Sequence, residues 1–250
     1  MDNTKAKIRI GESQIMSAKV LDQLKKLGNS SRAEFSLRYF KTGKGQYGEG
    51  DRFLGLNSAQ QHAVVKANRD LKLGELKKLL DSPIHEARAV ALLILVYQFQ
   101  KRRDKRKDIF DFYISNRTRI NNWDLVDCSA SQIVGAHLAD KNRNLLYRLA
   151  RSKSLWDRRI AIISTHHFIK RGDMNDTFRI AELLLADKED LMHKAVGWML
   201  RETGKKDADR LQLFLKTHYS RLPRTALRYA IERFPEDLRR IFLKGEWSAG

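Results

Sequence analysis

One short segment near the middle of the chain places an aromatic ring and an acid at helical spacing within a strongly basic protein. Trp123 and Asp127 are four positions apart, and residues with this spacing lie on one face of a helix. The chain contains 49 lysine and arginine residues against 30 acids, a formal net charge of +19. An acid is unfavourable on a surface that attracts phosphates unless it meets positive charge created by a reaction. Asp127 is therefore a candidate catalytic residue, and the alternative is an acid that caps a helix or pairs with a neighbouring arginine.

The excess of basic residues also indicates the kind of partner. A surface with this charge attracts a polyanion, and nucleic acid is the commonest one in a cell. An anionic membrane is the competing interpretation, but the sequence has no strongly amphipathic basic terminal helix and no lipidation motif. We predict a nucleic-acid partner and no membrane.

Cysteine content and hydropathy favour an intracellular protein. Cys128 is the only cysteine, so an internal disulfide is impossible and a reducing compartment is indicated. Residues 1–12 lack the apolar core of a signal peptide. The most apolar run, residues 89–96, is far shorter than the roughly 20 residues that span a bilayer. We expect a cytoplasmic protein, associated with the nucleoid if the source is bacterial.

The histidines do not form a recognisable metal motif. His166 and His167 are adjacent, and His137 and His193 lie elsewhere in the same half of the chain. Their spacing matches no zinc pattern, and a single cysteine adds little support. We therefore expect no metal and no cofactor.

The elements that must position Asp127 are predicted to be helices. The chain has only three prolines, alternating strand-like stretches are scarce, and apolar residues recur at helical spacing. Residues suited to helix ends punctuate this pattern at Ser58, at residues 81–83 and at residues 172–173. We predict an all-α fold. The clearest apolar stripes are Val20, Leu21, Leu24 and Leu27, and Leu76, Leu79 and Leu80.

A loose repeat organises most of these helices. A basic residue followed by small and apolar ones occurs at Arg88, Arg159, Lys194 and Arg224, and Asp127 takes the equivalent place between the first two. The successive spacings are 39, 32, 35 and 30 residues. An irregular period in the thirties with two helices per unit is typical of a HEAT-like α-solenoid, and the tetratricopeptide pattern is missing. We predict one such domain over residues 1–250, with the equivalent positions lining a concave basic groove.

Two segments depart from the repeat. Residues 41–51 contain four glycines but lack the spacing of a Walker loop. They form either a flexible connector or a loop whose amides and Lys44 approach a phosphate backbone. The densest basic run, residues 101–107, is either a solvated helix end or a phosphate-contacting flank.

Three motifs then occur in a recognisable order, supported by Tyr39-Phe40-Lys41 and by residues 53–56 nearer the start of the chain. Together they resemble the AlkD-type DNA alkylation repair family of HEAT-repeat DNA glycosylases, from about residue 30 to residue 233. The motifs are Asn122-Trp123-Asp124-Leu125-Val126-Asp127, Leu155-Trp156-Asp157-Arg158-Arg159-Ile160-Ala161, and Lys194-Ala195-Val196-Gly197-Trp198-Met199-Leu200-Arg201-Glu202.

The resemblance implies roles for individual residues. Asp127 and Trp123 match the family's catalytic acid and tryptophan, Trp198 matches its second active-site tryptophan, and Arg159 matches its phosphate-binding arginine. The chain departs from the best-known members at Asn122, where they have another tryptophan. Trp156 is interpreted as structural. The rival acid, Asp124, is interpreted as a helix N-terminal charge.

The function implied by the resemblance is that of a monomeric DNA N-glycosylase. It would excise cationic N3- or N7-alkylated purines from double-stranded DNA in base excision repair, without turning the base into a deep pocket. Lys44, Lys194 and Arg224 would join Arg159 in binding the DNA. The alternative left open is a catalytically silent HEAT-repeat module that binds DNA or RNA structures. A protein-binding scaffold is disfavoured by the net charge.

Overall fold

The computed structural model describes residues 16–247, and helices dominate it. No β-strand occurs among these residues, and the only β-type pairing found in them is an isolated bridge between Arg52 and Ile84. The all-α prediction is therefore confirmed. None of the helices within residues 16–247 is long and apolar enough to cross a membrane.

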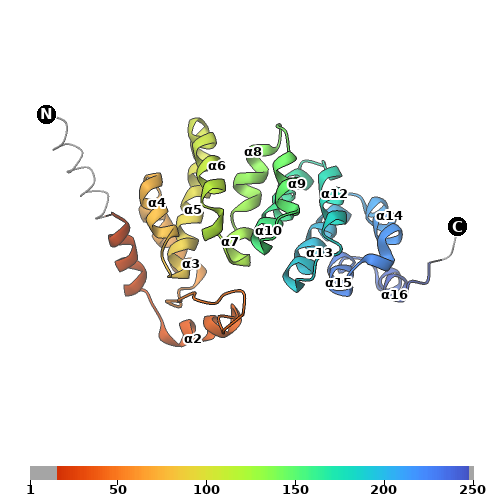
Figure 1. Cartoon of the computed structure of the whole chain (residues 1–250), viewed down its shortest axis with the longest axis horizontal. Helices are drawn as coiled ribbons and strands as arrows, with labels where there is room; N and C mark the ends of the chain where they lie inside the picture. The colour runs from red at the N-terminus through yellow and green to blue at the C-terminus, as the bar shows by residue number, and fades with distance from the viewer. Residues whose placement is uncertain (1–15, 248–250) are drawn as a thin grey trace. The chain divides into compact units, whose positions relative to one another are not determined.

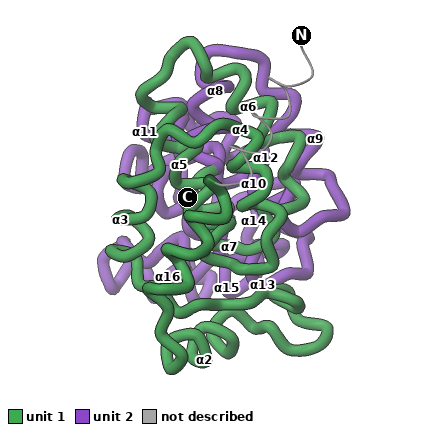
Figure 2. The backbone as a smooth tube through the Cα atoms, turned by 90° about the vertical axis from the view of Figure 1, so that its left-hand side faces the viewer, with its two compact units in different colours: residues 1–129 green, residues 130–250 purple. Residues whose placement is uncertain are grey.

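The chain divides into two compact units, residues 1–129 and residues 130–250, which Figure 2 colours separately. Each unit is described by itself below. The predictions of a single domain, of HEAT-like repeats and of a concave groove remain predictions.

The first unit is built around helix α5, and Figure 1 shows its helices in chain order. Residues 16–26 are also helical. The labelled elements are α2 (Ser30–Tyr39), α3 (Ser58–Asn68), α4 (Leu73–Leu80), α5 (His85–Lys101), η1 (Arg103–Lys105), α6 (Arg106–Ser115), η2 (Arg117–Arg119) and α7 (Trp123–Asp127).

Helix α5 forms the core of this unit because most of its surface is apolar. Twelve of its seventeen residues are buried, and it packs against α3, α4, α6 and α7. The predicted stripe of Leu76, Leu79 and Leu80 on α4 is completely buried. In the first predicted stripe Val20 and Leu24 are likewise buried, whereas Leu21 and Leu27 are half-buried. The helical periodicity thus identified all of the α4 stripe and half of the first one.

The helix caps lie close to the predicted positions. Helix α3 is capped by Asn57, one residue before the predicted Ser58, because the Asn57 side chain accepts a hydrogen bond from the backbone of Gln60 at 2.9 Å. The Gln60 side chain in turn accepts from the Asn57 backbone at 3.0 Å, which completes a capping box. Before α5, the hydroxyl of Ser82 accepts from the backbone N–H of Ile84 at 3.1 Å.

The second unit consists of shorter helices around a long one, α13. Its elements are a π-helical turn (Ser131–Gly135), α8 (Ala136–Leu138), α9 (Asn144–Ala150), α10 (Leu155–Ser164), α11 (His166–Lys170), α12 (Asn175–Leu183), α13 (Asp190–Gly204), α14 (Ala208–His218), η4 (Tyr219–Arg221), α15 (Arg224–Ala230) and α16 (Glu236–Lys244).

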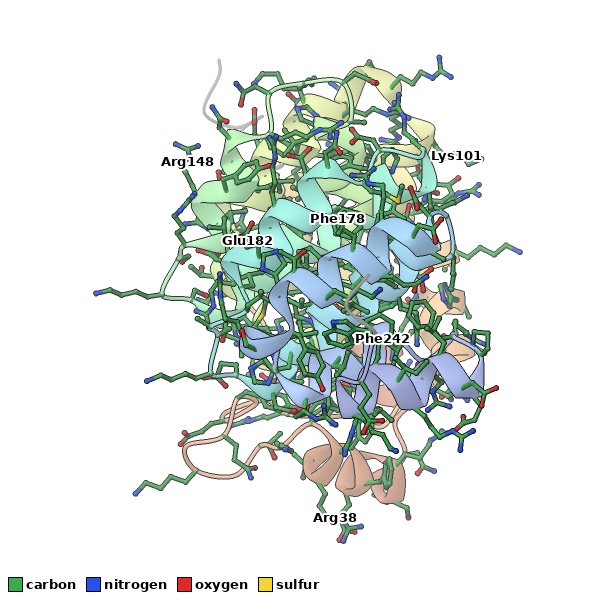
Figure 3. The ribbon with its side chains drawn as sticks, turned by 90° about the vertical axis from the view of Figure 1, so that its right-hand side faces the viewer. Arg38, Lys101, Arg148, Phe178, Glu182 and Phe242 are labelled. Atoms are coloured by element: carbon green, nitrogen blue, oxygen red, sulfur yellow. The ribbon has the colours of Figure 1, made fainter. Side chains whose placement is uncertain are left out.

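Glycines allow neighbouring helices of the second unit to approach closely. A Cβ atom on Gly135 would lie 2.2 Å from the carbonyl oxygen of Ser164 on α10, and one on Gly197 would lie 2.5 Å from the carbonyl oxygen of Ala226 on α15. Helix α13 packs against α10, α12, α14 and α15. At the end of the unit Phe242 is fully buried, and Figure 3 shows its position on α16.

Candidate active site

The predicted helical turn that carries Trp123 and Asp127 is present as α7, which comprises only Trp123–Asp127. It begins at Asn122, whose side-chain oxygen accepts a hydrogen bond from the Trp123 backbone at 2.8 Å. Trp123 and Asp127 are both half-buried and are separated by one helical turn. The structure thus places the two predicted catalytic residues side by side on one short helix.

Asn122 has a structural role that explains why an amide is suited to this position. Its side chain is completely buried, and its Nδ2 donates to Oδ2 of Asp51 at 3.2 Å while its oxygen caps α7. An indole could not both accept and donate in this way, because it carries a single N–H donor. Asn122 therefore connects the start of α7 to Asp51, at the end of the glycine-rich segment.

A buried histidine on α5, His85, contacts both α7 and the segment that contains Asp51. Nδ1 of His85 lies 3.2 Å from Oδ2 of Asp51, and Nε2 of His85 lies 2.7 Å from Oδ2 of Asp124. Arg88 donates to the other oxygen of Asp51 at 2.6 Å. The His85 and Asp51 side chains are each only 3% exposed. Since both ring nitrogens face carboxylates, the arrangement stabilises the doubly protonated imidazolium.

The protonation states in this cluster follow from opposing effects. Burial lowers the pKa of His85, but the hydrogen bonds to Asp124 and Asp51 outweigh burial and raise the pKa to about 9. For Asp51, burial raises the pKa, but His85 and Arg88 outweigh it and the pKa lies below its usual value. His85 is therefore a buried cation at neutral pH, held between two carboxylates.

Aromatic rings cover this cluster and join it to Trp123. The His85 ring stacks on Phe53 with centroids 4.6 Å apart, and Phe40 lies 5.0 Å from it. Phe40 also stacks on Trp123 at 5.5 Å with an interplanar angle of 19°. The position of the Trp123 ring is thus set by the backbone of α7, which carries it, and by its stack on Phe40.

The two carboxylates of α7 have different surroundings. Oδ2 of Asp124 contacts His85, and Oδ1 accepts the backbone N–H of Leu125 at 2.8 Å. Asp124 is in the first turn of α7, as predicted. Asp127 lies at the other end of the helix, and burial together with the negative charges of Asp124 and Asp127 raises the pKa of Cys128. Asp124 therefore has a structural role beside His85, and the catalytic role of Asp127 remains a prediction.

The other predicted catalytic and phosphate-binding residues belong to the second unit. Trp198 is half-buried on α13, and its ring lies 5.9 Å from the ring of His166. Arg159 on α10 is only 4% exposed, and its Nη1 donates to the carbonyl of Leu191 at 2.6 Å. The predicted phosphate contact of Arg159 thus involves a guanidinium that already binds a carbonyl group of its own unit. Both roles remain predictions.

The remaining predicted DNA-binding residues are more accessible. Lys44 is exposed in the glycine-rich segment. Lys194 has a side chain that is 42% exposed and forms an ion pair with Asp190 at 2.7 Å. Arg224 is exposed, and its Nη2 donates to the carbonyl of Leu243 at 2.9 Å. Of these, Lys44 is the residue whose surroundings most favour a phosphate contact.

The first basic repeat position, Arg88, differs from the prediction. Arg88, expected to line a groove together with the later basic residues, is buried and forms an ion pair with Asp51. The prediction of a groove-lining role for Arg88 was wrong because its side chain, near the start of α5, faces Asp51 and the backbone segment that follows Asp51. That segment is held against α5 by two hydrogen bonds, from the Arg52 backbone to Pro83 at 3.0 Å and from the His85 backbone to Arg52 at 2.8 Å.

Several residues of the basic run 101–107 already have partners within the first unit. Arg102 pairs with Asp70, and Lys107 pairs with Asp111 at 2.6 Å. Arg106 donates to the carbonyl of Phe99 at 3.0 Å and lies over its ring. These contacts favour the interpretation of the run as a solvated helix end.

The His85 cluster was not predicted from the sequence. Its members are far apart in the chain, since Asp51 and His85 are separated by 34 positions and His85 and Asp124 by 39. A signal was available in part, since a histidine and a glutamate open a strongly apolar helix at residues 85–86, where polar side chains require partners once buried. Glu86 does find such partners, because its carboxylate accepts the backbone N–H groups of Leu54 at 3.0 Å and Gly55 at 2.7 Å.

Comparisons with known proteins agree with this architecture. A family model described as "DNA alkylation repair enzyme" matches residues 20–234, which is most of the chain. The protein therefore belongs to the DNA alkylation repair enzyme family. The fold is similar to a solved structure described as a predicted DNA alkylation repair enzyme from Enterococcus faecalis, with a TM-score of 0.64 and 16% sequence identity. The similarity covers 84% of this chain and 97% of that one. A sequence search of curated proteins gave no significant match.

Proposed function

We propose that this protein is a DNA N-glycosylase that releases N3- and N7-alkylated purines from duplex DNA. The observation that carries the proposal is the arrangement of α7 in a member of a DNA alkylation repair family. Trp123 and Asp127 lie one turn apart on α7, while the neighbouring Asp124 is held by His85. The protein would act as a monomer where DNA is found, in the cytoplasm or on a bacterial nucleoid.

The proposed chemistry needs few groups because the substrate is already activated. Alkylation at N3 or N7 makes the purine cationic and weakens its glycosidic bond, so a general acid is unnecessary. The remaining tasks are to stabilise an oxocarbenium-like sugar and to hold the attacking water. A single carboxylate can perform both, in contrast to the two carboxylates of ordinary glycoside hydrolysis. Asp127 would supply negative charge where positive charge develops in the transition state.

The aromatic rings fit the same substrate. The negative face of an indole attracts a cation by roughly 0.5–2 kcal/mol, so Trp123 would favour an alkylated base over a neutral one. The stack of Phe40 on Trp123 would keep that ring from turning away. We also propose that Trp198 contributes to catalysis and that Lys44, Arg159, Lys194 and Arg224 contribute to DNA binding.

Selectivity for the leaving group tests this mechanism. We expect single-turnover release of 7-methylguanine but essentially no release of uracil or hypoxanthine from duplexes that differ only in the lesion. A neutral lesion would leave as an anion, and every tenfold in rate requires about 1.4 kcal/mol of stabilisation that the proposed residues do not provide. Similar rates for uracil and 7-methylguanine would show that the site contains an acid or a base-specific pocket.

Salt dependence tests the proposed mode of binding. We expect the logarithm of the affinity for undamaged duplex to fall linearly with the logarithm of salt concentration, with a slope near −0.9 per phosphate neutralised. Lys44→Ala should weaken binding and make the slope less negative by about 0.9, the value expected for one phosphate contact. This variant is preferable to Arg159→Ala, which would also remove the hydrogen bond to Leu191. An affinity insensitive to salt would contradict the proposed electrostatic contacts.

A further inference from the structure

Helix α2 is unusual because it presents large apolar side chains without burying any residue. None of the residues in Ser30–Tyr39 is buried. Phe35 is 59% exposed, Tyr39 is 55% exposed and Leu37 is 39% exposed. Exposed apolar side chains that cluster in this way mark binding surfaces more often than they serve stability. Helix α2 therefore has the character of a surface that contacts a ligand.

The exposed rings form a continuous series that reaches the candidate active site. Phe35 and Tyr39 lie on one face of α2 with ring centroids 5.9 Å apart and an interplanar angle of 18°. Tyr39 then meets the edge of Trp123 at 6.0 Å. A series of exposed rings, near-parallel between Phe35 and Tyr39 and edge-to-face between Tyr39 and Trp123, thus extends from the middle of α2 to the tryptophan that we assign to the damaged base.

Helix α2 is held in place through its backbone. Asn29 caps its start by accepting the N–H of Arg32 at 2.9 Å, and the Asn29 backbone donates to the carbonyl of Leu54 at 2.8 Å. Gly55 has a φ of +79°, and a Cβ atom there would lie 2.2 Å from the carbonyl oxygen of Asn29 and 2.5 Å from the nitrogen of Ala33. Because backbone contacts position the helix, the side chains of Phe35 and Tyr39 remain available to a ligand.

The charges around the rings identify the chemistry of that ligand. Arg38, Lys41 and Lys44 are exposed on α2 and the turn after it, and no ion pair to these three is found within the described residues. Figure 3 shows Arg38 extending away from α2. Flat rings flanked by cations suit an unpaired nucleobase, whose face stacks on an aromatic side chain while its phosphates meet lysine and arginine.

We propose that Phe35 and Tyr39 form a stacking platform for an unpaired base of the bound DNA, with Arg38 and Lys41 contacting the adjoining phosphates. The inference rests on the proposed function in taking DNA as the ligand. It adds a second role for the first unit, the recognition of bases that have left the helical stack near the lesion.

The test compares two DNA ligands that differ by one unpaired base. Dissociation constants are measured by fluorescence anisotropy for a fully paired duplex and for the same duplex with a single-base bulge. The wild-type protein should bind the bulged duplex more tightly. The Phe35→Leu/Tyr39→Leu double variant, which keeps apolar area but removes both rings, should lose about tenfold for the bulged duplex. Its affinity for the paired duplex should stay within about twofold.

Control variants separate stacking from other effects. Tyr229→Leu removes an exposed ring of the second unit and should leave the preference for the bulged duplex unchanged. Phe35→Trp keeps a flat ring and should retain the preference. Arg38→Ala should weaken binding to both duplexes, because a phosphate contact does not distinguish them.

Several results would overturn the proposal. The first is equal affinity of the wild-type protein for the two duplexes, and the second is an unchanged preference in the double variant. The third is ring-dependent binding to vesicles of phosphatidylglycerol and phosphatidylcholine instead of DNA. The fourth is a wild-type dimer that becomes a monomer in the double variant. Base release from methylated duplex is measured alongside. Base release with no effect of the double variant on bulge binding would reject the platform alone. A lost bulge preference in a protein that releases no base would reject the glycosylase and keep the platform.

Discussion

Replacing Asp127 with asparagine is expected to lower the rate of base release by about 100-fold or more while leaving duplex affinity unchanged or slightly higher. Asparagine keeps the size of the side chain but removes the charge that would stabilise the sugar cation, and the loss of one preorganised electrostatic group costs about 10²–10³ in rate. Affinity should not fall, because a negative charge near the DNA phosphates has been removed. The measurement is single-turnover release of 7-methylguanine at saturating enzyme, with affinity measured on undamaged duplex.

Asp124→Asn provides the matched comparison on the same short helix. It removes the charge of one of the two carboxylates that face His85, so its expected effect is a loss of stability, with base release largely retained in the folded fraction. Full activity in Asp127→Asn together with abolished activity in folded Asp124→Asn would show that the reactive carboxylate is Asp124.

The second large effect is expected from His85→Asn, which should lower the free energy of unfolding by about 3–5 kcal/mol. Breaking a buried charge pair leaves its partners without compensation, and His85 is the cation that faces both Asp51 and Asp124. The measurement is urea unfolding followed by circular dichroism. The exposed His62 supplies the control, since His62→Asn should change stability by less than about 0.5 kcal/mol.

The contribution of His85 should depend on pH in a defined direction. Its pKa is raised from 6.5 to about 9 in the folded protein, so the stabilisation is fully present below pH 6.5, declines above it and is lost as pH passes 9. The linked free energy is about 3 kcal/mol, at about 1.4 kcal/mol per pKa unit. The stability difference between wild type and His85→Asn should narrow accordingly between pH 6 and pH 9.5. A difference that stays constant over this range would mean that His85 is not charged in the folded state.

The features predictable from the sequence are those that depend on near neighbours. The helical spacing of Trp123 and Asp127, the buried stripe on α4 and the position of Asp124 in the first turn of its helix all arise within a few residues of the chain. The resemblance to the DNA alkylation repair family was likewise recognised from short motifs in the chain, and the family model matches residues 20–234.

The features that could not be predicted depend on contacts between distant segments. Nothing near Asp51 indicates that it will face His85 and Arg88, and the glycine-rich segment before it gave two open interpretations, a connector or a phosphate-binding loop. Arg88 and Arg159 occupy equivalent repeat positions, yet both are buried at 6% and 4% exposure. A repeat register predicts which positions correspond, but burial depends on what each helix packs against.

The most direct measurement of the central claim is the release of free base from methylated duplex DNA. DNA treated with a methylating agent is incubated with the wild-type protein, and the soluble fraction is separated by chromatography while the duplex is assayed for abasic sites. We predict free 3-methyladenine and 7-methylguanine, with an equal number of abasic sites in the DNA. Methylated DNA that is bound but yields neither free base nor abasic sites would contradict the account and identify the protein as a binding module.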